Sequence, residues 1–330
     1  MSSRQSHDIL MGQKVSAVMP IQEVTALEVP ILLLVFNRPE CTSRLIALIE
    51  SMRVAKLHVS ADGPRKGVEA DRENCKQVRA LIRNCRDVVP ERLRFHDENV
   101  GCKLGPASGI DWFFQHEEQG IILEDDCLPS PEFFEFCREM LARYQDDESV
   151  YAVSGNNFQN GKKRGDGSYY FSKYVHVWGW ATWRRAWAKN DLDMSFWPEF
   201  RASRQWDQLH PVPRERKFWE ELLDRVATKR LNTCWDYQWL ASIWAQSGKA
   251  IIPNVNMVTN VGFGPSATHT KDLRSPFAKL PTQHIGLIKH PSSEEVCTRA
   301  DRYVFSRNYH PDFWQRMLRK WRKLKHRFWE

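Results

Sequence analysis

Short apolar runs alternate with segments of helical spacing over the first 125 residues. Residues 30–36 (PILLLVF) form a continuous apolar run, which is typical of a strand covered on both faces of a parallel sheet. Residues 45–52 have helical spacing, and residues 56–61 predict a second strand. Another helix, a short strand near residues 93–96 and a further helix lead into a strand at 121–123. This order predicts an α/β fold with an open, mostly parallel sheet flanked by helices.

Polar side chains directly follow three of these predicted strands. Asn37 and Arg38 follow the first, Asp62 ends the second, and three acids, Glu124, Asp125 and Asp126, end the third. In open α/β sheets, ligands bind at the carboxyl ends of the strands. We therefore expect these side chains to lie together at one edge of the sheet.

The acidic triplet itself points to a cation. Three adjacent carboxylates repel one another and lose hydration at a strand end, so a positive charge should compensate them. Mg²⁺ and Mn²⁺ suit all-oxygen ligands and usually bring a phosphate-bearing substrate. The alternative is a solvated acidic turn.

The second half of the chain has a different character. An aromatic-rich helix is expected after Pro131, and ten of the fourteen tryptophans lie between Trp178 and Trp244. No repeat or low-complexity linker interrupts the sequence. We predict an N-terminal tail over 1–28, one domain over 29–271, and an extension over 272–330 that is rich in proline, histidine and charge.

Composition narrows the class of protein. Hydrophobic residues make up 42% and charged residues 27%, as in ordinary globular proteins. No apolar run approaches the roughly 20 residues that span a bilayer, and the N-terminus lacks the pattern of a secretory signal. Eight cysteines without paired spacing favour a reducing compartment. We expect a cytoplasmic protein.

The net charge of +7 belongs mainly to one segment. Residues 311–330 contain seven basic and two acidic residues, so the rest of the chain has no strong basic footprint and nucleic acid is not expected as a partner. The apolar residues of this segment share one helical face: Trp314, Met317, Leu318, Trp321, Leu324 and Phe328. A basic amphipathic helix predicts peripheral binding to the inner face of an anionic cell membrane. A helix docked on the protein's own core is the alternative.

Four sequence blocks occur in an informative order: ILEDDCLPSPEFFEF, VWGWATWRRAW, CWDYQW and NVGFGPSATHT. With them, residues 29–271 resemble nucleotide-sugar glycosyltransferases of the GT-A fold. The resemblance is greatest to bacterial surface-polysaccharide transferases and extends distantly to N-acetylglucosaminyltransferase I. It implies a Rossmann-like fold and inverting transfer of a sugar, with N-acetylglucosamine one candidate, from a UDP-sugar to a saccharide or lipid-linked acceptor. Mn²⁺ or Mg²⁺ would be the cofactor.

The resemblance also implies roles on the donor side. Arg38, next to Asn37, would contact the donor diphosphate, because a planar cation suits phosphate oxygens. Asp62 would accept the uracil N3–H, and Lys103 would add charge near the phosphates. The alternatives are a solvent-facing arginine, a turn-forming aspartate and a surface lysine.

Within the triplet, Asp126 is implied to bind the metal, Asp125 the donor ribose or a metal-bound water, and Glu124 to lie nearer the donor sugar. His269 belongs to a segment that resembles the loop closing over the bound nucleotide sugar. It would bind the metal or the diphosphate, since neutral imidazole suits Mn²⁺. A surface histidine is the alternative.

Two further motifs are implied to contact the sugars. Trp178, Gly179 and Trp180 resemble a loop beneath the donor and acceptor sugars, where indoles offer flat apolar faces; core packing is the alternative. Asp236, flanked by aromatic residues, matches the general base of the resembling inverting enzymes. A helix N-cap is the other interpretation of this aspartate.

Two other functions are compatible with the same fold. A sugar nucleotidyltransferase is disfavoured because no glycine-rich, basic loop follows the first predicted strand. A non-catalytic sugar-binding or scaffold protein would require Asp126 or Asp236 to be misplaced.

Overall fold

The structure is a computed structural model of the 330-residue chain, and it describes residues 27–86, 88–264, 272 and 275–309. Two of the predictions, metal binding by His269 and the amphipathic helix over 311–330, lie outside the described residues. Among the described helices, none is long and apolar enough to cross a membrane.

The core of the molecule is an eight-stranded sheet with the order β3-β2-β1-β4-β8-β6-β9-β7. Its strands are β1 (Ile31–Val35), β2 (Leu57–Ala61), β3 (Arg92–Phe95), β4 (Gln119–Glu124), β6 (Val150–Ser154), β7 (Tyr169–Ser172), β8 (Trp180–Trp183) and β9 (Lys249–Pro253). The pairs β4–β8, β6–β8 and β7–β9 are antiparallel and the others are parallel, so β7 and β8 run against the other six strands. A small antiparallel pair joins β5 (Cys127–Pro129) to β10 (Val258–Asn260).

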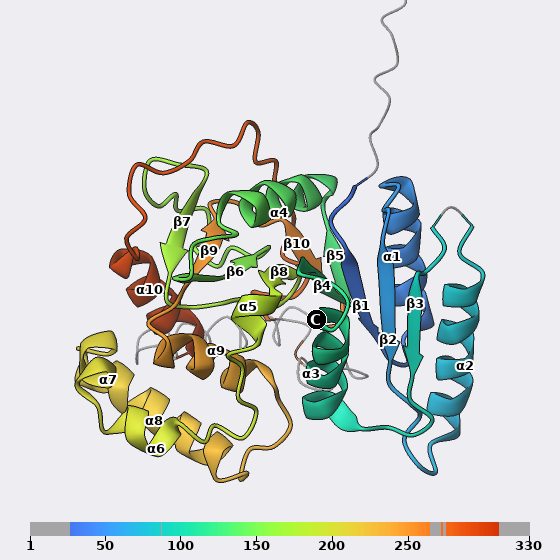
Figure 1. The fold of residues 1–330 in the computed structure, drawn as a ribbon, viewed down its shortest axis with the longest axis horizontal. Helices are drawn as coiled ribbons and strands as arrows, with labels where there is room; N and C mark the ends of the chain where they lie inside the picture. Colours follow the sequence, from blue (N-terminus) through green and yellow to red (C-terminus); the bar gives the residue numbers. More distant parts are fainter. Residues whose placement is uncertain (1–26, 87, 265–271, 273–274, 310–330) are drawn as a thin grey trace, which may run out of the picture.

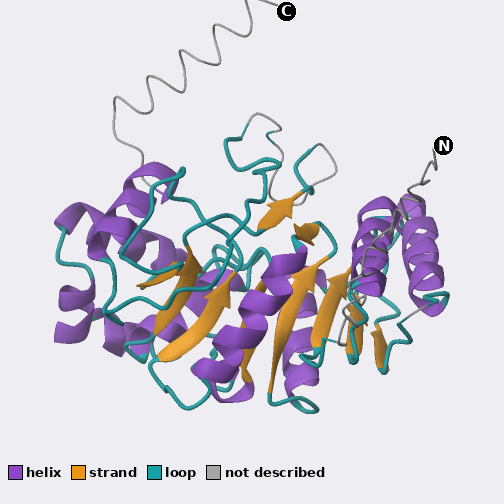
Figure 2. Cartoon of the chain, turned by 90° about the horizontal axis from the view of Figure 1, so that it is seen from above, coloured by secondary structure: helices purple, strands orange, loops and turns teal. Residues whose placement is uncertain are grey.

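Helices lie on both sides of the row of strands, as the view from above shows (Figure 2). They are α1 (Pro39–Ser51), α2 (Glu69–Arg83), α3 (Gly101–Phe114), α4 (Pro131–Arg143), α5 (Arg184–Trp187), α6 (Trp197–Arg201), α7 (Arg204–Leu209), α8 (Pro213–Ala227), α9 (Asp236–Ala245) and α10 (Thr298–Val304), which continues into a π-helical turn (Phe305–Tyr309). The expected fold class, an open and mostly parallel sheet flanked by helices, is confirmed.

The first half of the chain folds as its apolar pattern predicts. β1 and β2 are buried at every position, because helices cover both faces of this part of the sheet. β1 is in register with its neighbours, so that Val35 pairs with Ala61 and Leu34 with Glu124. The carboxyl ends of β1, β2 and β4 therefore meet at one edge, which brings together the polar residues that follow them.

The second half is built around aromatic side chains. Trp180, Trp187, Trp235 and Trp239 pack against one another with ring centroids 5.0–6.2 Å apart. Helices α6, α7 and α8 gather at the end of the molecule away from α1 and α2 (Figure 1). Residues 275–309 pack on this half, where Asp301 of α10 accepts hydrogen bonds from Ser172 Oγ (2.6 Å) and Lys173 N (3.3 Å).

Candidate active site

The ends of β1 and β4 are held together by Asp125. Its backbone N–H donates to Leu34 O (3.0 Å), which extends the ladder between the two strands by one bond. Its carboxylate accepts from Phe36 N (3.1 Å) and from Arg38 Nη1 (3.0 Å). Asp125 therefore has a fixed orientation at the carboxyl edge of the sheet, with one oxygen on the backbone and the other on a cation.

Arg38 is a cation that two acids of the triplet contact. The same Nη1 atom that bonds Asp125 also bonds Asp126 Oδ2, so one nitrogen serves two carboxylates. Burial lowers the pKa of Arg38, but the charges of Asp125 and Asp126 outweigh it and hold this pKa above its usual range. The guanidinium is therefore a permanent positive charge at the site.

Glu124 is short of compensating charge. The residue is half-buried, and no hydrogen-bond donor to its carboxylate is found in the part of the chain that the structure describes. Burial raises the pKa of Glu124, and repulsion from Asp126 and Asp125 raises it further; Asp236 makes a smaller contribution. Burial also raises the pKa of Asp125, despite its bond to Arg38. The site therefore favours an additional proton or cation.

Asp126 is covered by the chain that leaves β10. Val261 N donates to the Asp126 carbonyl (2.8 Å), and Asn260 Nδ2 approaches Asp126 Oδ1 (3.5 Å). A Cβ atom on Gly262 would lie 1.9 Å from Asp126 Oδ2, so only glycine fits beside this carboxylate. Because the atoms that could bind a metal ion here are carboxylate oxygens, Asp126 and its neighbours fit a hard divalent cation such as Mg²⁺ or Mn²⁺.

A second group of ligand types lies at the opposite end of the sheet. His58, Glu91 and Glu117 offer one ligand atom each, all within 4.8 Å of one another, and this group could hold a metal ion. No sequence motif marks this group, because the three residues come from separate segments of the chain. Lys56 Nζ already lies 3.3 Å from Glu117 Oε2 and compensates its charge.

Asp62 follows β2 as predicted, and its carboxylate organises the loop before α3. Its two oxygens accept from the backbone N–H groups of Gly63 (2.8 Å), Val100 (2.9 Å) and Gly101 (3.2 Å), and from Asn99 Nδ2 (2.8 Å). Four donors match the four lone-pair positions of a carboxylate. Contact with a nucleobase stays a prediction, and it requires Asp62 to exchange one of these bonds.

Asn37 is anchored by a residue that the sequence patterns did not reveal. Its Nδ2 donates to Asp71 Oδ1 (2.7 Å) on α2, and the Arg65 guanidinium bonds the same carboxylate. This hydrogen bond from Arg65 lowers the pKa of Asp71. The more exposed Arg65 also lies over the Phe36 ring, 5.8 Å from its centroid. Asp71 thus positions Asn37 and Arg65 at the edge where β1 ends.

Lys103 and Asp236 approach this edge from different parts of the chain. Lys103, in the first turn of α3, donates from Nζ to Asn232 Oδ1 (3.1 Å) in the segment before α9. Asp236 is the first residue of α9 and is half-buried, so it lies in the first turn and is not the N-cap. The positive end of a helix stabilises a carboxylate there. Its influence on Glu124 places Asp236 within electrostatic reach of the acidic triplet.

The three residues of the Trp178–Trp180 motif have different environments. Gly179 has a φ of +73°, and a Cβ there would lie 2.8 Å from Val258, so the turn requires glycine. Trp178 is partly exposed and contacts Phe263, with ring centroids 5.7 Å apart. Trp180 is 1% exposed and stacks on Trp235 in the aromatic core. Trp178 can present a ring face to a ligand, whereas the buried Trp180 takes part in core packing.

Comparison with known proteins gives distant structural likenesses. No protein-family model matches the chain, and no curated protein matches it. The solved structure of HddC from Yersinia pseudotuberculosis is similar with a TM-score of 0.30 and 11% identity, over 52% of this chain and 85% of that one. Mouse xyloside xylosyltransferase 1, in its apo form, is similar with a TM-score of 0.29 and 14% identity, over 66% of this chain and 82% of that one.

Proposed function

We propose that the protein transfers a sugar from a UDP-sugar to a saccharide or lipid-linked acceptor in surface-polysaccharide synthesis, with inversion at the anomeric carbon and with Mn²⁺ or Mg²⁺ as cofactor. The observation that most supports this is the charge deficit at the sheet edge, where Glu124, Asp125 and Asp126 share one guanidinium. A nucleoside diphosphate adds further negative charge. A divalent cation bound with it would compensate both the ligand and the acids.

In this proposal each residue of the edge has one task on the donor. Asp126 holds the metal ion, together with His269 from outside the described residues. The bound ion supplies Lewis-acid stabilisation to the departing diphosphate. Arg38 contacts the diphosphate, and Asp125, oriented by Phe36 N, faces the ribose. Glu124 lies nearer the donor sugar.

Asp236 acts on the acceptor. It takes the proton of the attacking hydroxyl as that oxygen bonds the anomeric carbon from the face opposite the leaving diphosphate. It lies in the first turn of α9, where the positive end of the helix favours a negative charge. Trp178, which is partly exposed, offers an apolar ring to the sugars.

The connection between β1 and α1 supports this function over nucleotidyl transfer. Only Phe36, Asn37 and Arg38 lie between the two elements, so no glycine-rich basic loop is present there to bind a nucleoside triphosphate. The geometry favours a diphosphate donor contacted by Arg38.

A panel of nucleotide sugars with Mn²⁺ tests the proposal. Ligand at about 100 times its Kd stabilises the folded state by about 2.7 kcal/mol, so the donor should raise the melting temperature measurably. We expect one or more UDP-sugars to stabilise the wild type with Mn²⁺ and not with EDTA. The absence of any metal-dependent stabilisation across the panel would contradict the proposed function.

Residues 311–330, outside the described residues, are proposed to bind an anionic membrane surface at which a lipid-linked acceptor is presented. Each basic residue near such a surface contributes about 1 kcal/mol. We expect the full chain to co-sediment with vesicles containing phosphatidylglycerol, and a chain lacking 311–330 to remain in the supernatant. Equal sedimentation of both chains would refute this part.

A further inference from the structure

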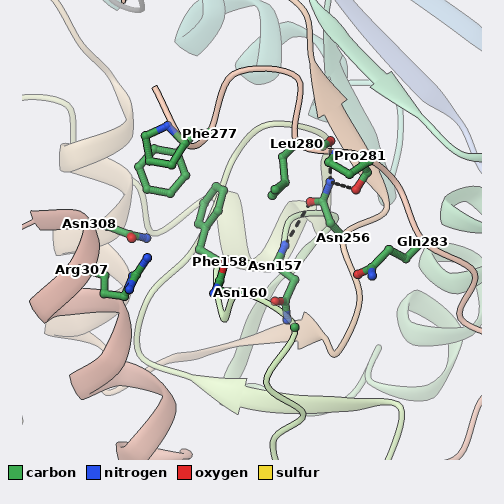
Figure 3. Close-up of a pocket in the computed structure, with 12 residues that line it drawn as sticks. Asn157, Phe158, Asn160, Asn256, Phe277, Leu280, Pro281, Gln283, Arg307 and Asn308 are labelled. Carbon is green, nitrogen blue, oxygen red and sulfur yellow. Dashed lines mark hydrogen bonds between the residues drawn. The ribbon is translucent and has the colours of Figure 1, made fainter. Parts of the chain in front are cut away.

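Figure 3 shows a pocket of about 160 Å³, lined by residues that follow β6, by residues of the segment 276–283, and by Arg307 and Asn308. A cavity of this order accommodates a six-membered ring. Trp178 links it to the acids: its ring contacts Phe158, which lines the pocket, and also Phe263, which follows Gly262 beside Asp126. Asn256 lines the pocket, and Asn260, four residues later in the chain, contacts Asp126. An extended chain covers about 13 Å in four residues, which is the scale of the separation between the pocket and the acids.

The lining has the composition of a carbohydrate site. Phe158 and Phe277 form an edge-to-face pair with centroids 5.1 Å apart, and rings of this kind pack against the C–H faces of sugars. Five amide side chains also line the pocket: Asn157, Asn160, Asn256, Gln283 and Asn308. Amides both donate and accept, as sugar hydroxyls do.

The amides divide into two sets. Asn256 donates to the carbonyls of Leu280 and Pro281 (3.1 Å each), and Asn157 donates to Pro253 O (2.6 Å), so these two fix the shape of the pocket. The dashed lines on Asn256 in Figure 3 show its part of this arrangement. Asn160, Gln283 and Asn308 make no side-chain hydrogen bond within the described ranges, which leaves their amides for a ligand.

Among the described residues, one charged side chain lines the pocket. It is Arg307, whose guanidinium also lies 5.6 Å from the centroid of the Tyr303 ring. Lys162 and Arg164 lie over the same ring, at 4.8 Å and 5.3 Å from its centroid, but they do not line the pocket. A guanidinium bonds a carboxylate or phosphate through parallel N–H groups, so Arg307 suits an anionic group on a bound sugar.

We propose that this pocket binds the acceptor and that it recognises a saccharide unit carrying a negative charge. The rings pack on the sugar, the three available amides bond its hydroxyls, and Arg307 bonds its anionic group. From there the acceptor extends along Trp178 toward the acids. This inference rests on the proposed function, because it supplies the acceptor side of the same reaction.

Calorimetric titration of the full chain with two tetrasaccharides tests the inference. The acidic probe alternates glucuronate with N-acetylglucosamine, and the neutral probe contains N-acetylglucosamine alone. We expect the wild type to bind the acidic probe about tenfold more tightly, as a charge-assisted hydrogen bond would allow. Raising the salt concentration to about 1 M should remove most of this preference, because the screening length then falls to about 3 Å.

Two variants with matched controls locate the binding. Arg307→Gln should abolish the preference for the acidic probe, whereas Arg302→Gln, at an exposed position on α10, should keep it. Phe277→Ala should weaken both probes, whereas Leu287→Ala, at a position that is 97% exposed, should weaken neither. If Phe277→Ala melts well below the wild type, Asn308→Ala replaces it. Wild-type affinity in Arg307→Gln and in the pocket variant, or no binding of either probe to the wild type, would overturn the inference.

The same proteins titrated with UDP and Mn²⁺ separate this inference from the proposed function. The pocket variants should bind UDP within about twofold of the wild type, because they lie beyond Trp178. Retained UDP binding without any saccharide binding would remove the pocket inference alone. Failure of the wild type to bind UDP with any divalent metal would remove the proposed function itself.

Discussion

The two ends of the sheet treat buried carboxylates in opposite ways. At the amino ends of the strands, Glu117 is 7% exposed and has two partners, His58 Nε2 at 3.0 Å and Lys56 Nζ at 3.3 Å. At the carboxyl ends, one nitrogen of Arg38 serves both Asp125 and Asp126. At the amino ends of the strands the buried carboxylate therefore has partners for its charge, whereas at the carboxyl ends two carboxylates depend on one cationic nitrogen.

This difference indicates which end of the sheet binds a ligand. An uncompensated charge in a partly buried place costs stability, so a fold that needs only packing pairs it, as with Glu117. A site that binds a cation with its substrate keeps the deficit, because the ligand completes it. His58, Glu91 and Glu117 offer metal ligands too, but Lys56 already compensates Glu117. The comparison predicts that the carboxyl edge, and not this group, binds the catalytic ion.

The largest expected effect concerns Asp236, the acid in the first turn of α9 that contributes to the electrostatics of Glu124. Asp236→Asn removes a general base while keeping its shape, and such a loss typically costs about 10²–10⁴ in rate. We expect donor binding to stay near the wild-type value while turnover falls by this factor. Steady-state kinetics with calorimetry of donor binding measures both quantities. A variant that keeps more than about a tenth of the wild-type kcat would assign the base to another residue.

Arg38→Gln tests the shortage of charge directly. Removing the cation leaves Asp125 and Asp126 facing each other, and breaking a buried ion pair by deleting one partner costs about 3 kcal/mol. We expect urea unfolding to show this loss, and Mn²⁺ to restore more stability in the variant than in the wild type. A variant with wild-type stability in the absence of metal would mean that the acids do not depend on Arg38.

Glu124→Gln gives the smallest expected effect and a pH signature. The pKa of Glu124 is raised in the folded state above its ordinary value of about 4.5. At a pH between the ordinary pKa and the raised one, the unfolded chain has released a proton that the folded chain retains. Stability therefore falls as the pH rises through this window. We expect the amide to raise the melting temperature by about 2 °C at pH 8 and to have less effect at pH 5.

Thermal melts of the wild type and of Glu124→Gln between pH 5 and pH 8 provide the measurement. Glu117→Gln is the matched control at the paired end, where loss of the bonds to His58 and Lys56 should lower stability at pH 8. A Glu124 variant that is less stable than the wild type at pH 8 would contradict the charge deficit.

The sequence predicted the first half of the fold better than the second. β1 and β4 contain continuous apolar runs that are buried on both faces, so their pattern is visible without partners. β8 is a four-residue strand of tryptophans and small residues between β4 and β6, and its tryptophans fit a strand and a loop equally well. Its place depends on the packing of Trp180 against Trp235, which is 55 residues away in sequence.

The same reasoning separates the parts of the site. Arg38 and the three acids directly follow strands, so topology alone predicted that they meet. Asp71 was not predicted, because its role depends on the packing of α2 against the end of β1. The hydrogen bonds that Asp62 accepts from the backbone N–H groups of Val100 and Gly101 depend likewise on the loop before α3, whose conformation the local sequence does not specify.

The central claim is that a metal ion and a nucleoside diphosphate bind together at the carboxyl edge. Calorimetric titration of UDP in the presence of Mn²⁺ tests it most directly, with the wild type, Asp126→Asn and Glu117→Gln compared at equal protein concentration. The account predicts that Asp126→Asn weakens binding by at least about tenfold, the equivalent of about 1.4 kcal/mol, and that Glu117→Gln leaves it unchanged. Equal affinity in the wild type and Asp126→Asn, or a loss confined to Glu117→Gln, would contradict it.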